Sequence, residues 1–183
     1  MLDIIFKKYQ QTTDKDTLHS YVSYFYKYHF EKYKARRNVI FEVGVLDGGS
    51  IKAWNDYFIN SNIFCIDIYY EKQFIDWVTT QERINCLQGD AYNAPGLDRI
   101  PGIDIFIDDG PHTLQSQLIS IDKFLPKINK GGIFIIEDIQ KDEDLLKLYD
   151  RVPEEYKKYT YPVDLRFVKG RYDDRLLVIQ LPE

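Results

Sequence analysis

The chain of 183 residues predicts an α/β fold: a doubly wound, seven-stranded and mostly parallel sheet with helices on both faces and an antiparallel C-terminal hairpin. Short apolar runs alternate with segments whose apolar residues recur at helical spacing. Glycines or acidic residues follow several of these runs, as they do at the carboxyl ends of parallel strands. The last two runs are separated by turn-forming residues, which is typical of a hairpin.

The first half of the chain predicts a sheet built from β-α-β units. Runs 39–43 and 63–67 are short and apolar, as buried parallel strands are. Segment 50–58 between them has apolar residues at helical spacing and follows two glycines, so we expect a helix there. A helix over 71–80 and a strand over 84–88 follow.

The second half continues the alternation and ends in the hairpin. The elements expected before the hairpin are strand 103–108, helix 113–125, strand 132–137 and helix 142–149. Two strands near 163–168 and 175–180 then flank segment 169–174, whose glycine and aspartates suit a turn at the sheet edge.

Length and composition favour one domain. A chain of 183 residues can bury one full core but not two comfortable ones. We therefore expect a single domain over residues 1–183, with a helical cap or lid segment over 1–37 and an α/β core over 38–183. Hydrophobic residues make up 44% and charged residues 29%, as in soluble globular proteins, and no apolar run is long enough to span a bilayer.

The net charge and the cysteine content indicate the cellular compartment and the classes of binding partner. Residues 1–8 lack the apolar core of a signal peptide. Cys65 and Cys86 lie in apolar, strand-like runs, where a cysteine is mostly a small buried residue. We therefore expect a cytoplasmic protein without a membrane partner. The net charge of −5 repels a phosphate backbone, which disfavours nucleic acid as a partner.

The segment before the first strand contains an aromatic pattern. Tyr21, Tyr24, Phe25 and Tyr28 are spaced as on one face of a helix. We expect this face to pack against the sheet, and the alternative is a lid that faces the substrate.

Two predicted strands end in clusters of acids. Asp108 and Asp109 follow one apolar run, and Glu137 and Asp138 follow the next. Crowded carboxylates repel one another and shift toward the protonated form, so a cation between them would explain the pattern. The alternative is structural, because acids before a helix also form turns and N-caps.

His112 lies three residues after Asp109, in the sequence Asp-Asp-Gly-Pro-His. Histidine exchanges protons near neutral pH and is the side chain most often used as a general base. Alone, it could equally be a hydrogen-bonded histidine at the start of a helix. The four acids and the histidine together favour metal-assisted catalysis, and the residues leave open whether Asp108 or Asp109 reaches the metal.

The loop over 44–50 joins the first strand to its helix, where open α/β sheets bind ligands. Leu46 occupies the second glycine position of a dinucleotide motif, and the lysine of a phosphate-binding P-loop is absent. A nucleoside ligand that lacks phosphates does not need a loop with glycine at each of these positions. Asp67 ends the second strand, where a carboxylate accepts ribose hydroxyls, and Asp90 after the third could bond an adenine amine. Each aspartate alone could instead be a helix cap or turn former.

In this order, the motifs resemble those of class I S-adenosylmethionine-dependent methyltransferases. The segments that carry the resemblance are 41–44, Asp67, 89–90, 104–109 and 130–132. More narrowly, the chain is similar to the metal-dependent macrolide sugar O-methyltransferases and the cephalosporin hydroxylase-like enzymes. The matching segments there are 13–15, 19–21, 42–45, 48–50, 108–112 and 136–138.

The resemblance implies a Rossmann-like fold that uses S-adenosylmethionine and Mg²⁺. It implies that Asp109, Glu137 and Asp138 bind the metal and that His112 is the general base. It also implies cofactor contacts from Glu42, Gly44, Ser50, Asp67, Asp90 and Asp108. Asp14, Lys15 and His19 would cover the cofactor or the substrate.

We therefore expect a Mg²⁺- and S-adenosylmethionine-dependent O-methyltransferase that acts on a hydroxyl of a sugar, a glycan or a glycosylated metabolite. Mg²⁺ prefers oxygen ligands and leaves positions that two neighbouring hydroxyls could fill. The alternatives are a methyltransferase for catechol-like or other vicinal diols and a non-catalytic nucleoside-binding module. We also expect a second subunit to help close the site, with contacts through the hairpin near 164–175 or the N-terminal helix.

Overall fold

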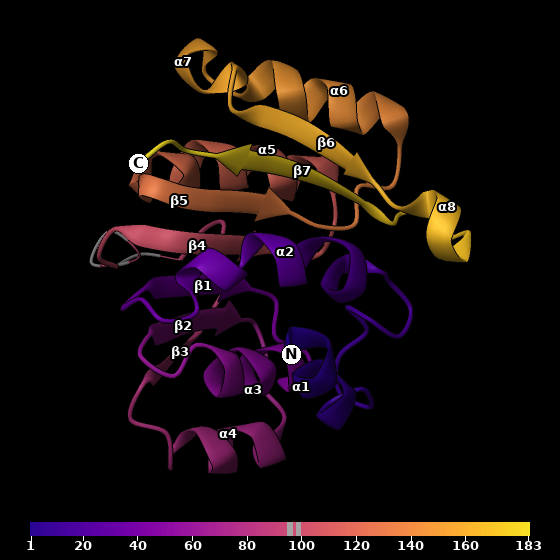
Figure 1. Cartoon of the computed structure of the whole chain (residues 1–183). Coiled ribbons are helices and arrows are strands. Elements are labelled where there is room, and N and C mark those ends of the chain that lie inside the picture. Colours follow the sequence, from indigo (N-terminus) through magenta and orange to yellow (C-terminus); the bar gives the residue numbers. More distant parts are fainter. Residues whose placement is uncertain (95–96, 98–99) are drawn as a thin grey trace.

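The computed structural model describes residues 1–94, 97 and 100–183. The strands are β1 Val39–Val43, β2 Asn62–Asp67, β3 Ile84–Gln88, β4 Ile103–Asp108, β5 Ile128–Ile136, β6 Thr160–Asp164 and β7 Arg175–Gln180. They form one seven-stranded sheet in the order β3-β2-β1-β4-β5-β7-β6 (Figure 1). The first five strands run parallel, and β7 pairs antiparallel with both β5 and β6. The predicted fold class is confirmed.

The register of the central strands determines where a ligand can bind. Val43 at the end of β1 pairs with Ile66 in β2 and with Asp108 in β4, and Asp108 in turn pairs with Ile136 in β5. The loops that follow these strands therefore meet at one edge of the sheet. The chain order also reverses between β1 and β4, and open α/β sheets bind ligands beside such a reversal.

Helices cover the sheet and connect its strands. They are α1 Leu2–Lys8, α2 Lys27–His29, α3 Gly49–Tyr57, α4 Lys72–Val78, α5 Leu114–Phe124, α6 Asp142–Arg151, α7 Glu154–Lys157 and α8 Arg166–Lys169. Shorter turns are the π-helical η1 Val22–Tyr26 and the 3₁₀ helices η2 Glu31–Tyr33 and η4 Leu125–Lys127.

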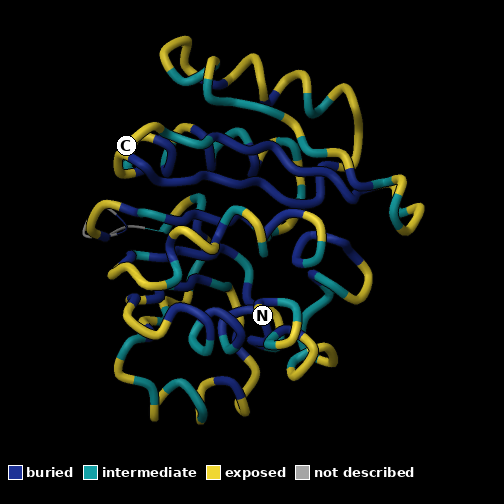
Figure 2. Tube along the Cα trace, viewed as in Figure 1, coloured by how far each residue is buried: buried dark blue, intermediate teal, exposed yellow. Residues whose placement is uncertain are grey.

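Two apolar layers pack against the two faces of the sheet. One contains the N-terminal segment, α3 and α4, and the other contains α5 and α6. Successive residues of a strand point to opposite faces, so Ile105 and Ile107 join the first layer while Phe106 joins the second. The inner strands β1, β4, β5 and β7 are largely buried, whereas the edge strands β3 and β6 and the helices α6, α7 and α8 keep exposed surfaces (Figure 2).

The C-terminal hairpin differs in position from the prediction. We expected a strand over 163–168, but β6 ends at Asp164, which pairs with Arg175, and α8 follows at Arg166. Asp164 accepts hydrogen bonds from the backbone and the guanidinium of Arg166, which starts the helix. Gly170 then ends the helix with a φ of 73°, a left-handed conformation typical of a C-terminal glycine.

The predicted aromatic face of the N-terminal segment is wrong. Tyr21 and Phe25 are buried, but Tyr24 and Tyr28 are 52% and 67% exposed. The cause is the π-helical turn η1, whose i→i+5 hydrogen bonds shift the faces away from the 3.6-residue period. The shift buries Tyr26, which the pattern had not singled out.

No helix within the described residues is long and apolar enough to cross a membrane. The two cysteines are free thiols on paired positions of β2 and β3, with their sulfur atoms 3.1 Å apart. Cys65 is buried, as expected, and Cys86 is half-buried.

Candidate active site

A cavity of about 490 Å³ opens at the carboxyl ends of the parallel strands. Its volume is typical of small-molecule sites, which are roughly 300–1,000 Å³. The loops after β1, β2, β3 and β4 supply the walls, and the N-terminal segment adds one residue. The lining residues are Asp14, 43–46, 66–68, 89–92 and 109–112.

Gly44 allows two of these loops to touch. Its φ is 84°, and a Cβ atom there would lie 1.8 Å from the carbonyl oxygen of Asp109. The Asp109 amide also donates a hydrogen bond to the Val43 carbonyl, at 2.9 Å. A glycine is therefore required for the loop after β4 to approach β1, and this approach sets the position of Asp109.

Asp67 and Asp90 line the cavity, where a nucleoside would need them. Asp67 Oδ2 accepts hydrogen bonds from the backbone amides of Val45 and Leu46, at 2.7 and 3.2 Å. Asp67 thus holds the loop after β1. A hydrogen bond from the Asn93 side chain lowers the pKa of Asp90, so this carboxylate is held in its charged form.

Three residues predicted to contact a cofactor do not line the cavity. Glu42 is fully buried and accepts hydrogen bonds from the Ser50 hydroxyl and the Trp54 indole. Asp108 accepts hydrogen bonds from the Tyr92 hydroxyl and the Gly110 amide, and burial raises the pKa of its carboxyl. Glu42 thus holds helix α3, and Asp108 holds the loops after β3 and β4. Of the six predicted contacts, the structure brings Gly44, Asp67 and Asp90 to the cavity.

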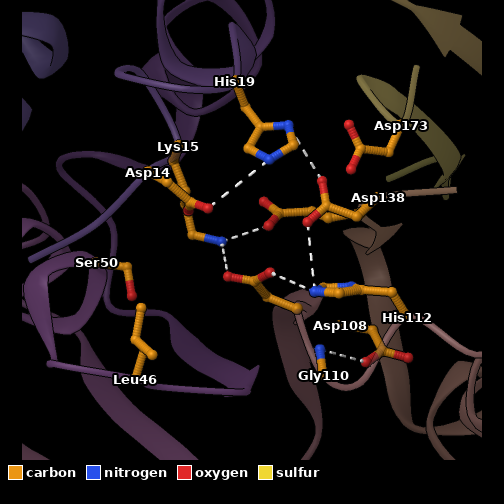
Figure 3. Close-up of polar contacts among 12 residues, drawn as sticks. Asp14, Lys15, His19, Leu46, Ser50, Asp108, Gly110, His112, Asp138 and Asp173 are labelled. Carbon is orange, nitrogen blue, oxygen red and sulfur yellow. Dashed lines mark hydrogen bonds and ion pairs between the residues drawn. The ribbon is translucent and has the colours of Figure 1, made fainter. Parts of the chain in front are cut away.

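Beside the cavity lies a group of side chains that could hold a metal ion. Asp109, His112 and Asp138 each offer one ligand atom, and these atoms lie within 4.8 Å of one another. His112 Nε2 is 3.8 Å from Asp109 Oδ1 and 3.4 Å from Asp138 Oδ2 (Figure 3). Two carboxylates on a half-buried edge suit Mg²⁺, which usually binds one or two carboxylates and keeps other positions for water or substrate.

Backbone strain is concentrated around this group. Within the described part of the chain, the non-glycine residues with positive φ are Leu46, His112 and Asp138, at 49°, 54° and 56°. They lie in the loops after β1, β4 and β5, and His112 and Asp138 belong to the group itself (Figure 3). Such conformations cost on the order of 1–3 kcal/mol each and cluster at functional sites. The strain supports a functional role for these loops.

Asp138 is held from the side of the N-terminal segment. The Tyr21 hydroxyl donates a hydrogen bond to Asp138 Oδ1 at 2.5 Å, and His19 Nδ1 lies 3.3 Å from the same oxygen. Burial and the charge of Asp109 raise the pKa of Asp138 to about 6, against the favourable effects of His19, His112 and Tyr21. A cation placed next to Asp138 would stabilise its charged form.

Glu137, the third predicted metal ligand beside Asp109 and Asp138, lies next to this group. The ammonium of Lys15 lies between the Glu137 and Asp109 carboxylates. Lys15 Nζ donates a hydrogen bond to Asp109 Oδ2 at 2.6 Å and another to Glu137 Oε2, and the Tyr26 hydroxyl donates to Glu137 Oε1. Of the three predicted ligands, only Asp109 and Asp138 therefore lie in the group with His112.

Sequence reasoning missed two tyrosines and the role of Lys15. Tyr21 belongs to the predicted aromatic face and to segment 19–21 of the resemblance, without a role at the site, and the pattern does not single out Tyr26. Lys15 was noted in the Thr-Asp-Lys segment of the resemblance as a residue that covers the cofactor or the substrate. That segment was the only signal in the sequence that it belongs to the site.

Comparisons of the sequence with known proteins find relatives that are named as O-methyltransferases. None of the protein-family models compared with the chain matches it. The 8-demethyl-8-(2-methoxy-alpha-L-rhamnosyl)-tetracenomycin-C 3'-O-methyltransferase of Streptomyces olivaceus is 30% identical over 141 residues, covering 71% of this chain and 35% of that protein. The mycinamicin VI 2''-O-methyltransferase of Micromonospora griseorubida is 33% identical over 125 residues, covering 62% and 30%. The chain thus spans about a third of the length of these curated relatives.

Solved structures show the same architecture. The MycE methyltransferase of the mycinamycin biosynthetic pathway, in complex with Mg, S-adenosylhomocysteine (SAH) and mycinamycin VI, has a TM-score of 0.75 at 22% identity and covers 100% of this chain and 54% of that one. Fibrillarin from Methanococcus jannaschii has a TM-score of 0.60 at 19% identity, covering 82% and 70%. The chain therefore has the fold of the MycE methyltransferase, which fibrillarin shares in large part.

Proposed function

We propose that this chain, a relative of the sugar O-methyltransferases with their fold, is a Mg²⁺- and S-adenosylmethionine-dependent O-methyltransferase that acts on a hydroxyl of a sugar or glycosylated metabolite. The observation that carries the proposal is the group of Asp109, His112 and Asp138 at the edge of the cavity. Two carboxylates and an imidazole are what deprotonation of a metal-bound hydroxyl requires.

The cavity suits S-adenosylmethionine. Gly44 lines the cavity in the loop after β1, and Asp67 and Asp90 present carboxylates for the ribose hydroxyls and the adenine amine. The hydrogen bonds that hold Asp67 against Val45 and Leu46 orient this carboxylate in advance. The cofactor supplies a methyl group that is already activated, so the protein contributes chiefly by positioning the reactants.

The residues would share the remaining work as follows. Asp109 and Asp138 would hold Mg²⁺, whose charge makes an acceptor hydroxyl more acidic. His112 is 28% exposed in its side chain and lies against both carboxylates, so it can reach an acceptor hydroxyl placed between them. It would take the hydroxyl proton, as imidazole does near neutral pH.

The acceptor class follows from the relatives. The Streptomyces and Micromonospora proteins are named for methyl transfer to rhamnosyl-tetracenomycin and to mycinamicin VI, and MycE was solved with mycinamycin VI bound. These relatives favour a hydroxyl of a sugar attached to a small metabolite.

Transfer of an isotopically labelled methyl group tests the proposal. The purified chain is incubated with labelled S-adenosylmethionine and a rhamnosylated polyketide, a catechol or no acceptor, each with Mg²⁺ or with EDTA. We expect transfer to the glycosylated acceptor that needs Mg²⁺ and is lost in His112→Asn but kept in the control His29→Asn, whose imidazole stacks on Phe25 away from the site. Transfer to the catechol alone would support a diol methyltransferase. SAH binding without any transfer would support a non-catalytic module.

A further inference from the structure

We propose that Lys15 is a positioning residue that acts as a permanent cation of the site and assigns each carboxylate its task before a divalent ion binds. The proposal rests on the proposed function only where it takes Asp109 and Asp138 as the metal-binding pair. Its evidence is the set of contacts around the ammonium.

The ammonium lies at the centre of a buried acidic cluster. The Lys15 side chain is 1% exposed. Its Nζ contacts Asp109 and Glu137 and lies 3.6 Å from Glu42, and both glutamates are almost fully buried. An ammonium has three donor hydrogens and no acceptor, so it can face three carboxylates at once. Taking such charges out of water is unfavourable unless they are paired, which Lys15 achieves for this cluster.

The contacts divide the acids into two sets. Lys15 and the Tyr26 hydroxyl each donate to one oxygen of Glu137, so both oxygens of this carboxylate already accept a hydrogen bond. At Asp109, Lys15 takes only Oδ2. The other oxygen, Oδ1, remains 3.8 Å from His112 Nε2. Asp109 therefore keeps one oxygen toward the group with His112, whereas each oxygen of Glu137 accepts a hydrogen bond from Lys15 or Tyr26.

The charge balance gives the same division. Lys15 is one positive charge among four acids: Glu42, Asp109, Glu137 and Asp138. One ammonium cannot balance Asp109, Glu137 and Asp138 when all three are ionised, so the partly open pair Asp109 and Asp138 still attracts a divalent ion. Without Lys15 the repulsion would include Glu137, and a divalent ion would have more charge to neutralise.

The segment that carries Lys15 is fixed on both sides, so the ammonium does not depend on a mobile arm. The Gly49 amide donates to the Thr12 carbonyl at 3.1 Å, and the Tyr21 amide donates to the Lys15 carbonyl at 3.1 Å. The Lys169 ammonium of α8 binds the His19 carbonyl at 2.6 Å. These bonds connect residues 12–21 to α3 and to the C-terminal hairpin.

Thermal unfolding of Lys15→Met tests the inference without cofactor or acceptor. Methionine keeps the length of the side chain and removes its charge. In EDTA we expect the Tm to fall by roughly 10 °C, because one partner of a buried ion-pair cluster is lost. Excess Mg²⁺ should restore about half of this loss or more, and it should stabilise the wild-type chain by less. The control is Lys72→Met, which removes an exposed lysine and should behave as the wild type.

Two results would overturn the inference. The first is a Mg²⁺-induced rise in Tm that is no larger in Lys15→Met than in the wild type, because a residue that only fills space would give that outcome. The second applies if Lys15→Met does not fold. The double variant Lys15→Met with Glu137→Gln is then tested, because it removes one negative charge together with the positive charge, and we expect it to fold. Failure of this pair to fold would also refute the role. Absence of methyl transfer would count against the proposed function and leave these Tm results unchanged.

Discussion

Replacing Asp138 with asparagine should stabilise the metal-free protein at neutral and alkaline pH. Burial and the charge of Asp109 raise the pKa of Asp138 from 3.8 to about 6, so this carboxylate is ionised at neutral pH at a cost to the folded state. Asparagine has the same shape and no charge, and its side-chain oxygen can still accept the hydrogen bond from Tyr21. The substitution should therefore remove the cost and keep the contact.

The size and the sign of the effect follow from linkage. An acid whose pKa is higher in the folded than in the unfolded chain contributes stability that is fully present below the unfolded pKa and is lost as the pH rises through the folded pKa. For Asp138 this stability is lost between pH 3.8 and about pH 6. The loss amounts to about 3 kcal/mol, at about 1.36 kcal/mol per pH unit. In a chain of this length that corresponds to about 6–12 °C in Tm.

Urea unfolding in EDTA measures this difference at about pH 4 and about pH 8. We expect Asp138→Asn to be more stable than the wild type by up to about 3 kcal/mol at the higher pH and by little at the lower one. Excess Mg²⁺ should stabilise the wild type more than the variant, because the ion binds the charged carboxylate. The exposed Asp122, which pairs with Arg151, provides the matched control Asp122→Asn. A variant less stable than the wild type at the higher pH in EDTA would refute the reasoning.

Three further predictions concern the base, the loop contact and the cofactor. His112→Asn should lower kcat by roughly 10²–10⁴-fold and leave the Mg²⁺-induced rise in Tm in place, and a kcat near the wild-type value would exclude His112 as the base. Gly44→Ala should reduce stability by at least about 1–2 kcal/mol in urea unfolding, because φ is positive and the added Cβ meets Asp109; unchanged stability would show that the loops have room. Asp67→Asn should weaken binding of SAH about tenfold or more in calorimetry while Mg²⁺ binding is kept, and unchanged affinity would remove Asp67 from the cofactor site.

The sequence predicted the parts of the fold that depend on local pattern. Buried parallel strands are short apolar runs, and their carboxyl ends face one edge of the sheet wherever they occur in the chain. Asp109 and Asp138 could therefore be placed near each other from the ends of β4 and β5 alone. The antiparallel hairpin was predicted from the turn-forming residues between the last two apolar runs, although its first strand lies earlier in the chain, at Thr160–Asp164, and α8 follows it.

The parts that could not be predicted depend on contacts between distant residues. Lys15 reaches Asp109 across 94 positions and Glu137 across 122, and no local pattern encodes such contacts. The cluster of acids indicated that a cation lies among them, but the sequence pattern does not distinguish a lysine ammonium from a divalent metal ion. Tyr26 was missed because its burial depends on a π-helical turn, which departs from the helical period.

The most direct test of the metal site is anomalous diffraction at the manganese edge from crystals grown with Mn²⁺ and SAH. Mn²⁺ replaces Mg²⁺ at oxygen-rich sites and gives a signal that locates the ion. The proposed site predicts one peak within coordination distance of both Asp109 and Asp138, with His112 beside it and Lys15 still on Glu137. A peak elsewhere in the molecule, or no peak in crystals that contain SAH in the cavity, would contradict it.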